Sequence, residues 1–256
     1  MNKLESLYVV GFPKSGNTWL ARLIANVTSS KIHVNSKDDL INNSENCKNK
    51  NGRYIIYKIH GSNEIDKIEN SKKVYILRDP RAVFVSGFFH NYRRFSKKKV
   101  LSNKLVNLFF NFEVGNINNS WNNTLVARWN RFKNQLKSFE KINVGSWSHH
   151  VNFWTSLDNM VIVRYEDLHD NTEKELVRIL NELDISFDID ELRQIIQNES
   201  FESKKNQFIQ NKDFTNAAFL RSGKKDDWKQ FLDKKNQKNI ENTHCVNMLK
   251  FNYLKK

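Results

Sequence analysis

The chain has 256 residues, a formal net charge of +14 and a hydrophobic fraction of 39%. This length suits one domain spanning residues 1–256, near the size at which single cores stop growing, and no apolar run approaches the ~20 residues of a membrane-spanning helix. Clustered lysines and arginines attract polyanions, but the basic residues here are dispersed, and no heptad, zinc-ligand spacing or nucleic-acid motif accompanies them. We therefore expect neither a nucleic-acid nor a membrane partner.

The two cysteines, Cys47 and Cys245, are too few for a disulfide framework and too far apart for a metal site. This usage is typical of a reducing compartment. The first predicted strand begins almost at once after Met1, so we expect no signal peptide. These features predict a cytoplasmic protein without a bound metal.

The first predicted element is a buried strand at Leu7–Val10, which leads into the loop Gly11–Gly16 and a helix over Thr18–Val27. A glycine-bearing loop of this kind turns successive backbone N–H groups toward one point and feeds a helix N-terminus, which favours an oxyanion. In the common nucleoside-triphosphate loop a lysine follows the second glycine. Here Asn17 has that position, and the lysine lies inside the loop as Lys14. The pattern predicts a phosphate site whose cation has moved toward the other end of the loop.

A second strand is predicted at Tyr54–Lys58, and Lys58 and His60 stand at its exit. Residues two apart in a strand point to the same side, so an ammonium group and an imidazole enter one cleft together. Histidine has an unperturbed pKa of ~6.5 and is well suited to proton transfer near neutral pH. Of the remaining histidines, His90 is the second candidate base, at the end of a predicted helix.

A third strand, Val74–Leu77, runs into a helix predicted over Pro80–Asn91. Asp79 is a good N-cap, and proline suits the first helical turn because its missing N–H has no partner there. Arg78 thus stands at the mouth of a helix. Together with the hydroxyl of Ser86, its guanidinium can bind a terminal phosphate through charge-assisted hydrogen bonds.

The remaining elements complete an α/β pattern. The four predicted strands, with the fourth at Met160–Tyr165, are apolar runs, as in a mostly parallel sheet flanked by helices on both faces. Ligand loops then gather at the carboxyl ends of the strands. The segment 96–120 joins a basic run to a cluster of phenylalanines and is interpreted as a lid over an acceptor pocket or a partly disordered loop. Further helices are predicted at Leu125–Phe139, Thr172–Leu183 and Asp190–Gln197.

Five segments, in this order, resemble the cytosolic-type sulfotransferases that depend on 3′-phosphoadenosine 5′-phosphosulfate (PAPS). The resemblance extends from about Leu7 to Trp228. The segments are Pro13-Lys14-Ser15-Gly16-Asn17-Thr18-Trp19, Lys58-Ile59-His60, Arg78 with Ser86, Tyr165-Glu166-Asp167-Leu168, and Arg221-Ser222-Gly223 followed by Asp227-Trp228. Three positions depart from the family pattern: Ile59 replaces a threonine, Ser222 a lysine and Asp226 a glycine.

The resemblance implies a P-loop-like loop that binds the 5′-phosphosulfate, with His60 as the general base and Lys14 and Lys58 acting where negative charge develops. It also implies a 3′-phosphate held by Arg78 and Ser86 and an adenine near Tyr165. The implied donor-binding residues are Lys14, Ser15, Gly16, Asn17, Thr18, Trp19, Arg78, Ser86, Tyr165, Phe201, Arg221, Ser222 and Gly223. No metal is required.

The expected reaction moves a sulfonate group from PAPS to a hydroxyl of a small-molecule acceptor and releases adenosine 3′,5′-bisphosphate (PAP). Phenols, alcohols, amines and sugars all stay open as acceptor classes, and so does the oligomeric state. One alternative is a phosphotransferase or nucleotide hydrolase that uses ATP or GTP with magnesium; Asn17 argues against it. Another is a basic binding protein without catalysis, which the Lys58 and His60 pair disfavours.

Overall fold

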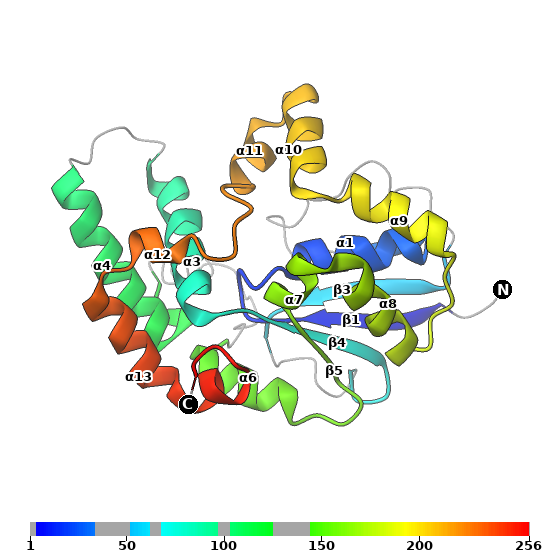
Figure 1. Ribbon diagram of the computed structural model, residues 1–256, viewed down its shortest axis with the longest axis horizontal. Helices are drawn as coiled ribbons and strands as arrows, with labels where there is room; N and C mark the ends of the chain where they lie inside the picture. The colour runs from blue at the N-terminus through cyan, green and yellow to red at the C-terminus, as the bar shows by residue number, and fades with distance from the viewer. Residues whose placement is uncertain (1–3, 34–51, 62–67, 97–102, 125–143, 256) are drawn as a thin grey trace, which may run out of the picture.

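The computed structural model describes residues 4–33, 52–61, 68–96, 103–124 and 144–255 (Figure 1). Their strands form one five-stranded sheet in the order β2-β3-β1-β4-β5, and every pairing is parallel. This confirms the α/β class and the parallel sheet. The strands are β1 (Glu5–Val10), β2 (Lys31–His33), β3 (Tyr54–Ile59), β4 (Lys72–Leu77) and β5 (Val161–Arg164).

Strand β1 lies at the centre of the sheet and fixes the level at which its neighbours end. Val10 is in register with Ile59 of β3 and with Tyr75 of β4. The residues that follow β1 and β3, Gly11 and His60, therefore leave the sheet side by side at one edge. Parallel strands place their carboxyl ends together, where ligands bind in open α/β sheets.

The side chains of β1 alternate between two buried clusters, one on each face of the sheet. Leu7 and Val9 belong to one cluster, and Tyr8 and Val10 to the other. Helices cover both faces, as the continuous apolar strands require. The first cluster includes residues of α1 (Asn17–Val27), α8 (Thr172–Glu182) and α9 (Ile189–Asn198), and the second includes residues of α3 (Pro80–Ser96), α4 (Asn103–Asn119), α6 (Trp147–Thr155), α12 (Trp228–Phe231) and α13 (Lys234–Lys250).

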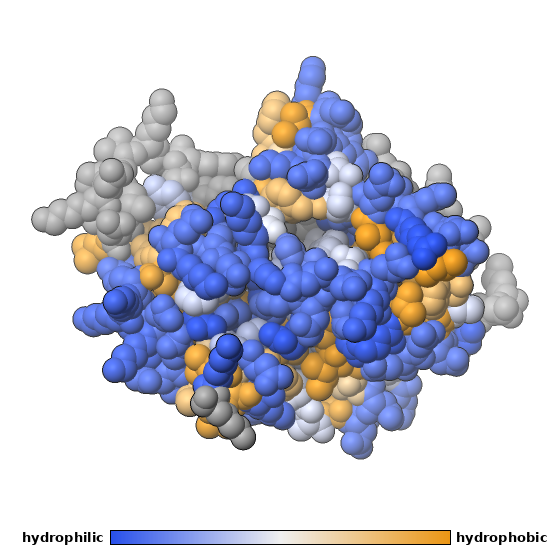
Figure 2. Space-filling view, in the orientation of Figure 1, coloured by the Kyte–Doolittle hydropathy of each residue, from blue (hydrophilic) through white to orange (hydrophobic). Residues whose placement is uncertain are grey.

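Four further helical elements lie between the helices and strands named above along the chain: η3 (Trp121–Asn123), α7 (Tyr165–Asp170), α10 (Phe201–Gln210) and α11 (Phe214–Phe219). Figure 1 shows α10 and α11 standing above the sheet, with the chain then descending to α12 beside α3. Hydrophilic side chains cover most of the face shown in Figure 2, and the surface is recessed beneath α10 and α11.

Most predicted elements are present, with two clear differences. The short strand β2 was not predicted; its three residues carry too little pattern to stand out. Of the two interpretations of 96–120, the partly disordered loop was wrong for residues 103–119, which form the helix α4, and the lid stays a prediction. Phe110, Val114 and Ile117 of α4 are buried at helical spacing. The helix predicted at Leu125–Phe139 lies outside the described residues.

Candidate active site

The loop after β1 has the tight geometry that its glycines predict. Gly16 has φ 106° and is the N-cap of α1, and Lys14 also has a left-handed backbone at φ 73°. The Ser15 N–H donates to the carbonyl of Phe12 at 3.1 Å and closes the turn. A Cβ atom on Gly11 would lie 2.6 Å from the carbonyl oxygen of Ile76 in β4. Glycine is therefore required at residue 11 by packing and at residue 16 by backbone conformation.

The carbonyl oxygen of Gly11 joins the loop to the end of β3. It accepts a hydrogen bond from Asn17 Nδ2 at 3.0 Å and one from His60 Nδ1 at 2.7 Å. The two donors lie 3.5 Å from each other. Asn17, which takes the place of the lysine of nucleotide-triphosphate loops, thus binds the loop's own backbone beside the predicted base.

These contacts assign the tautomer of His60. A carbonyl oxygen can only accept, so Nδ1 of His60 must carry the hydrogen of that bond. In the neutral ring the lone pair able to take a proton is then on Nε2. The structure thus brings Lys14, Asn17 and His60 to one edge of the sheet, with Nε2 of the neutral imidazole left able to accept a proton.

Arg78, which follows β4, contacts both the loop and Tyr165. Its Nη1 donates to the carbonyl of Lys14 at 3.2 Å, and its guanidinium lies 4.1 Å from the ring centroid of Tyr165. Arg78 Nε and the hydroxyl of Ser15 are both buried, and neither makes a hydrogen bond within the described residues. Buried donors of this kind require a partner. Phosphate oxygens between the loop and Arg78 would supply one, so these residues fit the phosphate groups of PAPS.

Two of the three aromatic residues in the implied donor-binding set lie together. Trp19 and Tyr165 meet edge to face with ring centroids 5.9 Å apart. Phe201 instead packs against Gly223, where an added Cβ would lie 2.7 Å from its ring. Tyr165 is the first residue of α7 rather than the last residue of a strand. Burial raises the pKa of Tyr165, while the nearby charge of Arg78 opposes that shift, so the phenol stays neutral.

The loop that contains Arg221, Ser222 and Gly223 is held by partners that the sequence did not single out. Arg221 forms an ion pair with Asp227, whose Oδ2 also accepts from the Ser222 hydroxyl at 2.7 Å. The carbonyl of Gly223 accepts from Nε2 of His169 at 2.9 Å. The loop is thereby tied to α7, the helix that begins with Tyr165.

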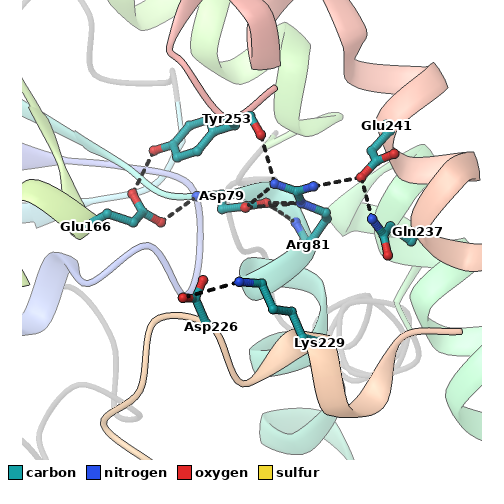
Figure 3. A network of polar contacts seen from close by, with 8 residues as sticks. All are labelled: Asp79, Arg81, Glu166, Asp226, Lys229, Gln237, Glu241 and Tyr253. Carbon is teal, nitrogen blue, oxygen red and sulfur yellow. Dashed lines mark hydrogen bonds and ion pairs between the residues drawn. The ribbon is translucent and has the colours of Figure 1, made fainter. Parts of the chain in front are cut away.

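The start of α3 is fixed by a polar network that reaches the C-terminal helix (Figure 3). Asp79 caps α3 by accepting from the Arg81 N–H at 2.9 Å, and it pairs with the Arg81 guanidinium at 2.7 Å. Arg81 also pairs with Glu241 of α13 at 2.7 Å and donates to the carbonyl of Tyr253 at 2.9 Å. Glu166 accepts from the Asp79 N–H and from the Tyr253 hydroxyl, each at 3.0 Å.

This network joins the buried Arg81 to three acids, of which Asp79 is buried and Glu166 and Glu241 are half-buried. Burial raises the pKa of Glu166, and the Asp79 N–H opposes that shift. The guanidinium of Arg81 also lies 4.2 Å from the ring centroid of Trp228. Arg78 therefore leaves the sheet next to a helix start that four separate segments hold in place.

The predicted site residues not yet described lie on α1, β3 and α3. Thr18 is in the first turn of α1, Lys58 is in β3 and Ser86 is in α3, six residues after Pro80. Among the described residues there is no group of three or more histidine, cysteine or acidic side chains suited to a metal ion. No helix in that part of the chain is long and apolar enough to cross a membrane.

A parallel α/β sheet, a glycine loop ahead of α1 and an arginine with an unsatisfied buried donor define a protein that binds the phosphates of a nucleotide. The family described as "Sulfotransferase domain" matches residues 4–251. The chain belongs to this family and is a PAPS-dependent sulfotransferase.

Curated relatives and solved structures agree with this assignment. "Sulfotransferase 2A1" of Macaca fascicularis is 27% identical over 90% of this chain and 79% of that protein. "Sulfotransferase 1B1" of Mus musculus is 25% identical over 88% of this chain and 77% of that protein. The fold is similar to that of mouse sulfotransferase SULT7A1 complexed with PAP, with a TM-score of 0.62, 21% identity and coverage of 95% of this chain and 84% of that one.

A structure of retinol dehydratase in complex with androsterone and inactive cofactor PAP is also similar in fold. Its TM-score is 0.59, with 16% identity over 97% of this chain and 82% of that chain.

We expect Gly16→Ala to destabilise the protein by more than about 1 kcal/mol, because alanine is strained at positive φ and its Cβ would lie 2.7 Å from the Tyr165 ring. Gly115→Ala is the matched control: Gly115 lies inside α4, and an added Cβ has nothing within 4 Å. That change should stabilise the helix by roughly 0.5–1 kcal/mol. Urea unfolding of both variants measures the difference, and equal stabilities would contradict the strain at Gly16.

Proposed function

We propose that this protein transfers the sulfonate group of PAPS to the hydroxyl of a small-molecule acceptor, with His60 as the general base. The observation that carries the proposal is the bond from His60 Nδ1–H to the Gly11 carbonyl. It leaves the basic lone pair on Nε2 of a ring adjoining the loop that fits the phosphates. A base must lie within reach of the proton that it removes, and a ring fixed at the loop meets that condition.

In the proposed reaction His60 Nε2 accepts the hydroxyl proton as the acceptor oxygen forms a bond to sulfur. The bond between sulfur and the bridging phosphate oxygen breaks, and PAP leaves with that electron pair. PAPS supplies the activated sulfonate group. The protein contributes alignment of the acceptor oxygen, sulfur and leaving oxygen.

Negative charge grows on the leaving phosphate oxygen, so cations and N–H groups directed at it stabilise the transition state. We assign this role to Lys14 and Lys58, together with the backbone amides from Ser15 to Thr18. Lys14 belongs to the loop, and Lys58 precedes His60 by two residues on β3. Both side chains therefore start from the edge of the sheet that carries His60.

We assign the 3′-phosphate to Arg78 and Ser86, with Arg221, Ser222 and the Gly223 amide closing over it. In the present structure Arg221 and Ser222 bind Asp227, so phosphate must compete with or rearrange that contact. We assign the adenine to Trp19 and Tyr165, together with Phe201, which packs against Gly223. Base stacking on aromatic rings supplies affinity that tolerates different bases.

For the acceptor we propose an apolar alcohol or phenol. Helices α3 and α4 meet through aromatic rings: Phe88 stacks on Tyr92 with centroids 5.5 Å apart and meets Phe110 at 4.7 Å. Phe89 of α3 meets Phe231 of α12 at 4.8 Å. Pockets for small molecules are mostly apolar, with a few polar groups that fix orientation. The cytoplasmic location expected from the sequence remains a prediction.

Titration calorimetry tests the donor site directly. We expect PAP to bind in the micromolar range without metal, because the loop and Arg78 present donors for phosphate groups, and we expect ATP with magnesium to bind more weakly. The two titrations use the same protein at the same salt concentration. Preference for magnesium ATP would contradict the donor assignment and favour a phosphotransferase.

We expect His60→Ala to lower kcat by about 10²–10⁴, the usual contribution of general acid–base catalysis, while PAP affinity stays near wild type. His149→Ala is the control, because His149 is exposed on α6. Transfer of radiolabelled sulfonate from PAPS to a panel of phenols, sterols and primary alcohols measures both variants. Wild-type turnover in His60→Ala would remove His60 from the mechanism.

Lys14→Ala should lower kcat by roughly 10²–10³, the cost of losing one donor to a developing charge. We expect a smaller effect on the affinity for PAP, which lacks the sulfonate. Lys238→Ala, at an exposed position on α13, controls for loss of a surface charge. An increase in the KM for PAPS at unchanged kcat would assign Lys14 to ground-state binding instead.

A further inference from the structure

A second hydrogen bond holds the backbone of His60, and it comes from helix α6. The backbone carbonyl of His60 accepts from Nε2 of His150 at 2.7 Å. His150 lies on α6, and the two residues are 90 positions apart in the sequence. Two bonds thus act together on His60: the bond from His150 holds its backbone, from which the ring extends, and the bond to Gly11 holds the ring.

The geometry assigns the tautomer of His150 as it does that of His60. The carbonyl of His60 can only accept, so Nε2 of His150 carries the hydrogen. In the neutral ring Nδ1 is then an acceptor, and the hydroxyl of Tyr75 lies 2.8 Å from it and donates. Tyr75, His150, His60 and Gly11 are thus linked by three hydrogen bonds, each of which joins a donor to an acceptor.

The surroundings of His150 keep these hydrogen bonds in a single arrangement. Only 3% of His150 is exposed, and Tyr75 is fully buried in the central part of the sheet. Burial lowers the pKa of His150 to about 3, so the ring stays neutral throughout the neutral pH range. Phe12 meets the imidazole edge to face at 5.5 Å, and Trp154 lies 6.1 Å away. A ring packed in this way cannot turn without moving its neighbours.

We propose that His150 is a positioning residue for catalysis: its Nε2–H holds the carbonyl of His60 and so sets the direction in which the His60 imidazole faces. The inference rests on the proposed role of His60 as the base. A rigid partner matters here because His60 is the first residue after β3, where the regular strand has ended. Misplacing a catalytic group by about 1 Å can cost 10²-fold in rate.

A histidine that only fills the core would predict something else. Its replacement would lower the stability of the whole protein and leave the ring of His60 and the turnover of the folded fraction unchanged. The two roles separate if side chains of equal length, with and without an N–H donor, are compared at residue 150. Glutamine keeps a donor near the place of Nε2, whereas methionine has a similar shape and no donor.

The experiment compares His150→Gln with His150→Met, using His244→Met as the control. His244 is also buried, with its pKa lowered by burial to about 4, and its Nδ1 contacts the Ser148 hydroxyl at 2.8 Å. We expect His150→Met to lower kcat about 100-fold, with the KM for PAPS and the affinity for PAP within about twofold of wild type. The kcat of His150→Gln should be at least tenfold higher than that of His150→Met, and His244→Met should retain wild-type kcat.

Two further measurements distinguish failure of this inference from failure of the proposed function. In a His60→Ala background, His150→Met should cause no additional loss of kcat, because its effect passes through His60. Nitrogen-15 spectra of the histidine rings, assigned by single substitutions, should show His60 as the Nδ1–H tautomer in the wild type and a mixture in His150→Met. These spectra need no acceptor.

Equal kcat values for His150→Gln and His150→Met, or an unchanged His60 tautomer in His150→Met, would overturn the positioning role. Full activity in His60→Ala would instead overturn the base assignment on which the inference rests. Should His150→Met fail to fold, His150→Asn replaces it. Its shorter amide reaches toward Tyr75 and not toward the His60 carbonyl, so the same 100-fold loss is expected.

Discussion

The carbonyl oxygen of Gly11 is the contact on which the candidate site depends. It is the first acceptor beyond the central strand, so the hydrogen bonds of β1 to β3 and β4 fix its position. Asn17 binds it from the helix side and His60 from the neighbouring strand. One oxygen therefore holds the loop against its helix and decides which nitrogen of the neutral His60 ring carries the hydrogen. The close approach of Ile76 explains why the residue must be glycine.

A second group of contacts holds the other half of the site. Arg81 connects the start of α3 to α13 and to the backbone of Tyr253, while Glu166 connects α7 to the N–H of Asp79 and to the hydroxyl of Tyr253 (Figure 3). Removing one member would leave a buried charge unpaired, and such losses are costly. This explains how Arg78, which follows β4, and Tyr165, the first residue of α7, come to stack at 4.1 Å. The candidate donor site thus depends on the packing of the C-terminal helix.

Much of the fold was predictable because its signals are local. Apolar runs followed by glycine or by Asp-Pro marked β1, β3 and β4, and Asn171 and Asp188 cap α8 and α9 as their side chains allow. Local signals failed for β2, which is three residues long, and for α4, where asparagine and a glycine weaken the helical pattern. Burial of Phe110, Val114 and Ile117 stabilises α4 in spite of that weak propensity.

The sequence by itself determined the family and predicted the phosphate loop and the candidate base, because each of these depends on residue types at fixed short spacing. The tertiary structure decided the proton positions on His60 and His150, the pairing of Arg221 with Asp227 and the contact of Phe201 with Gly223. His150 drew no attention in the sequence because its partners, His60 and Tyr75, lie 90 and 75 residues away. Hydrogen-bond partners across such distances are set by how helices pack on the sheet, and packing leaves no local pattern along the chain.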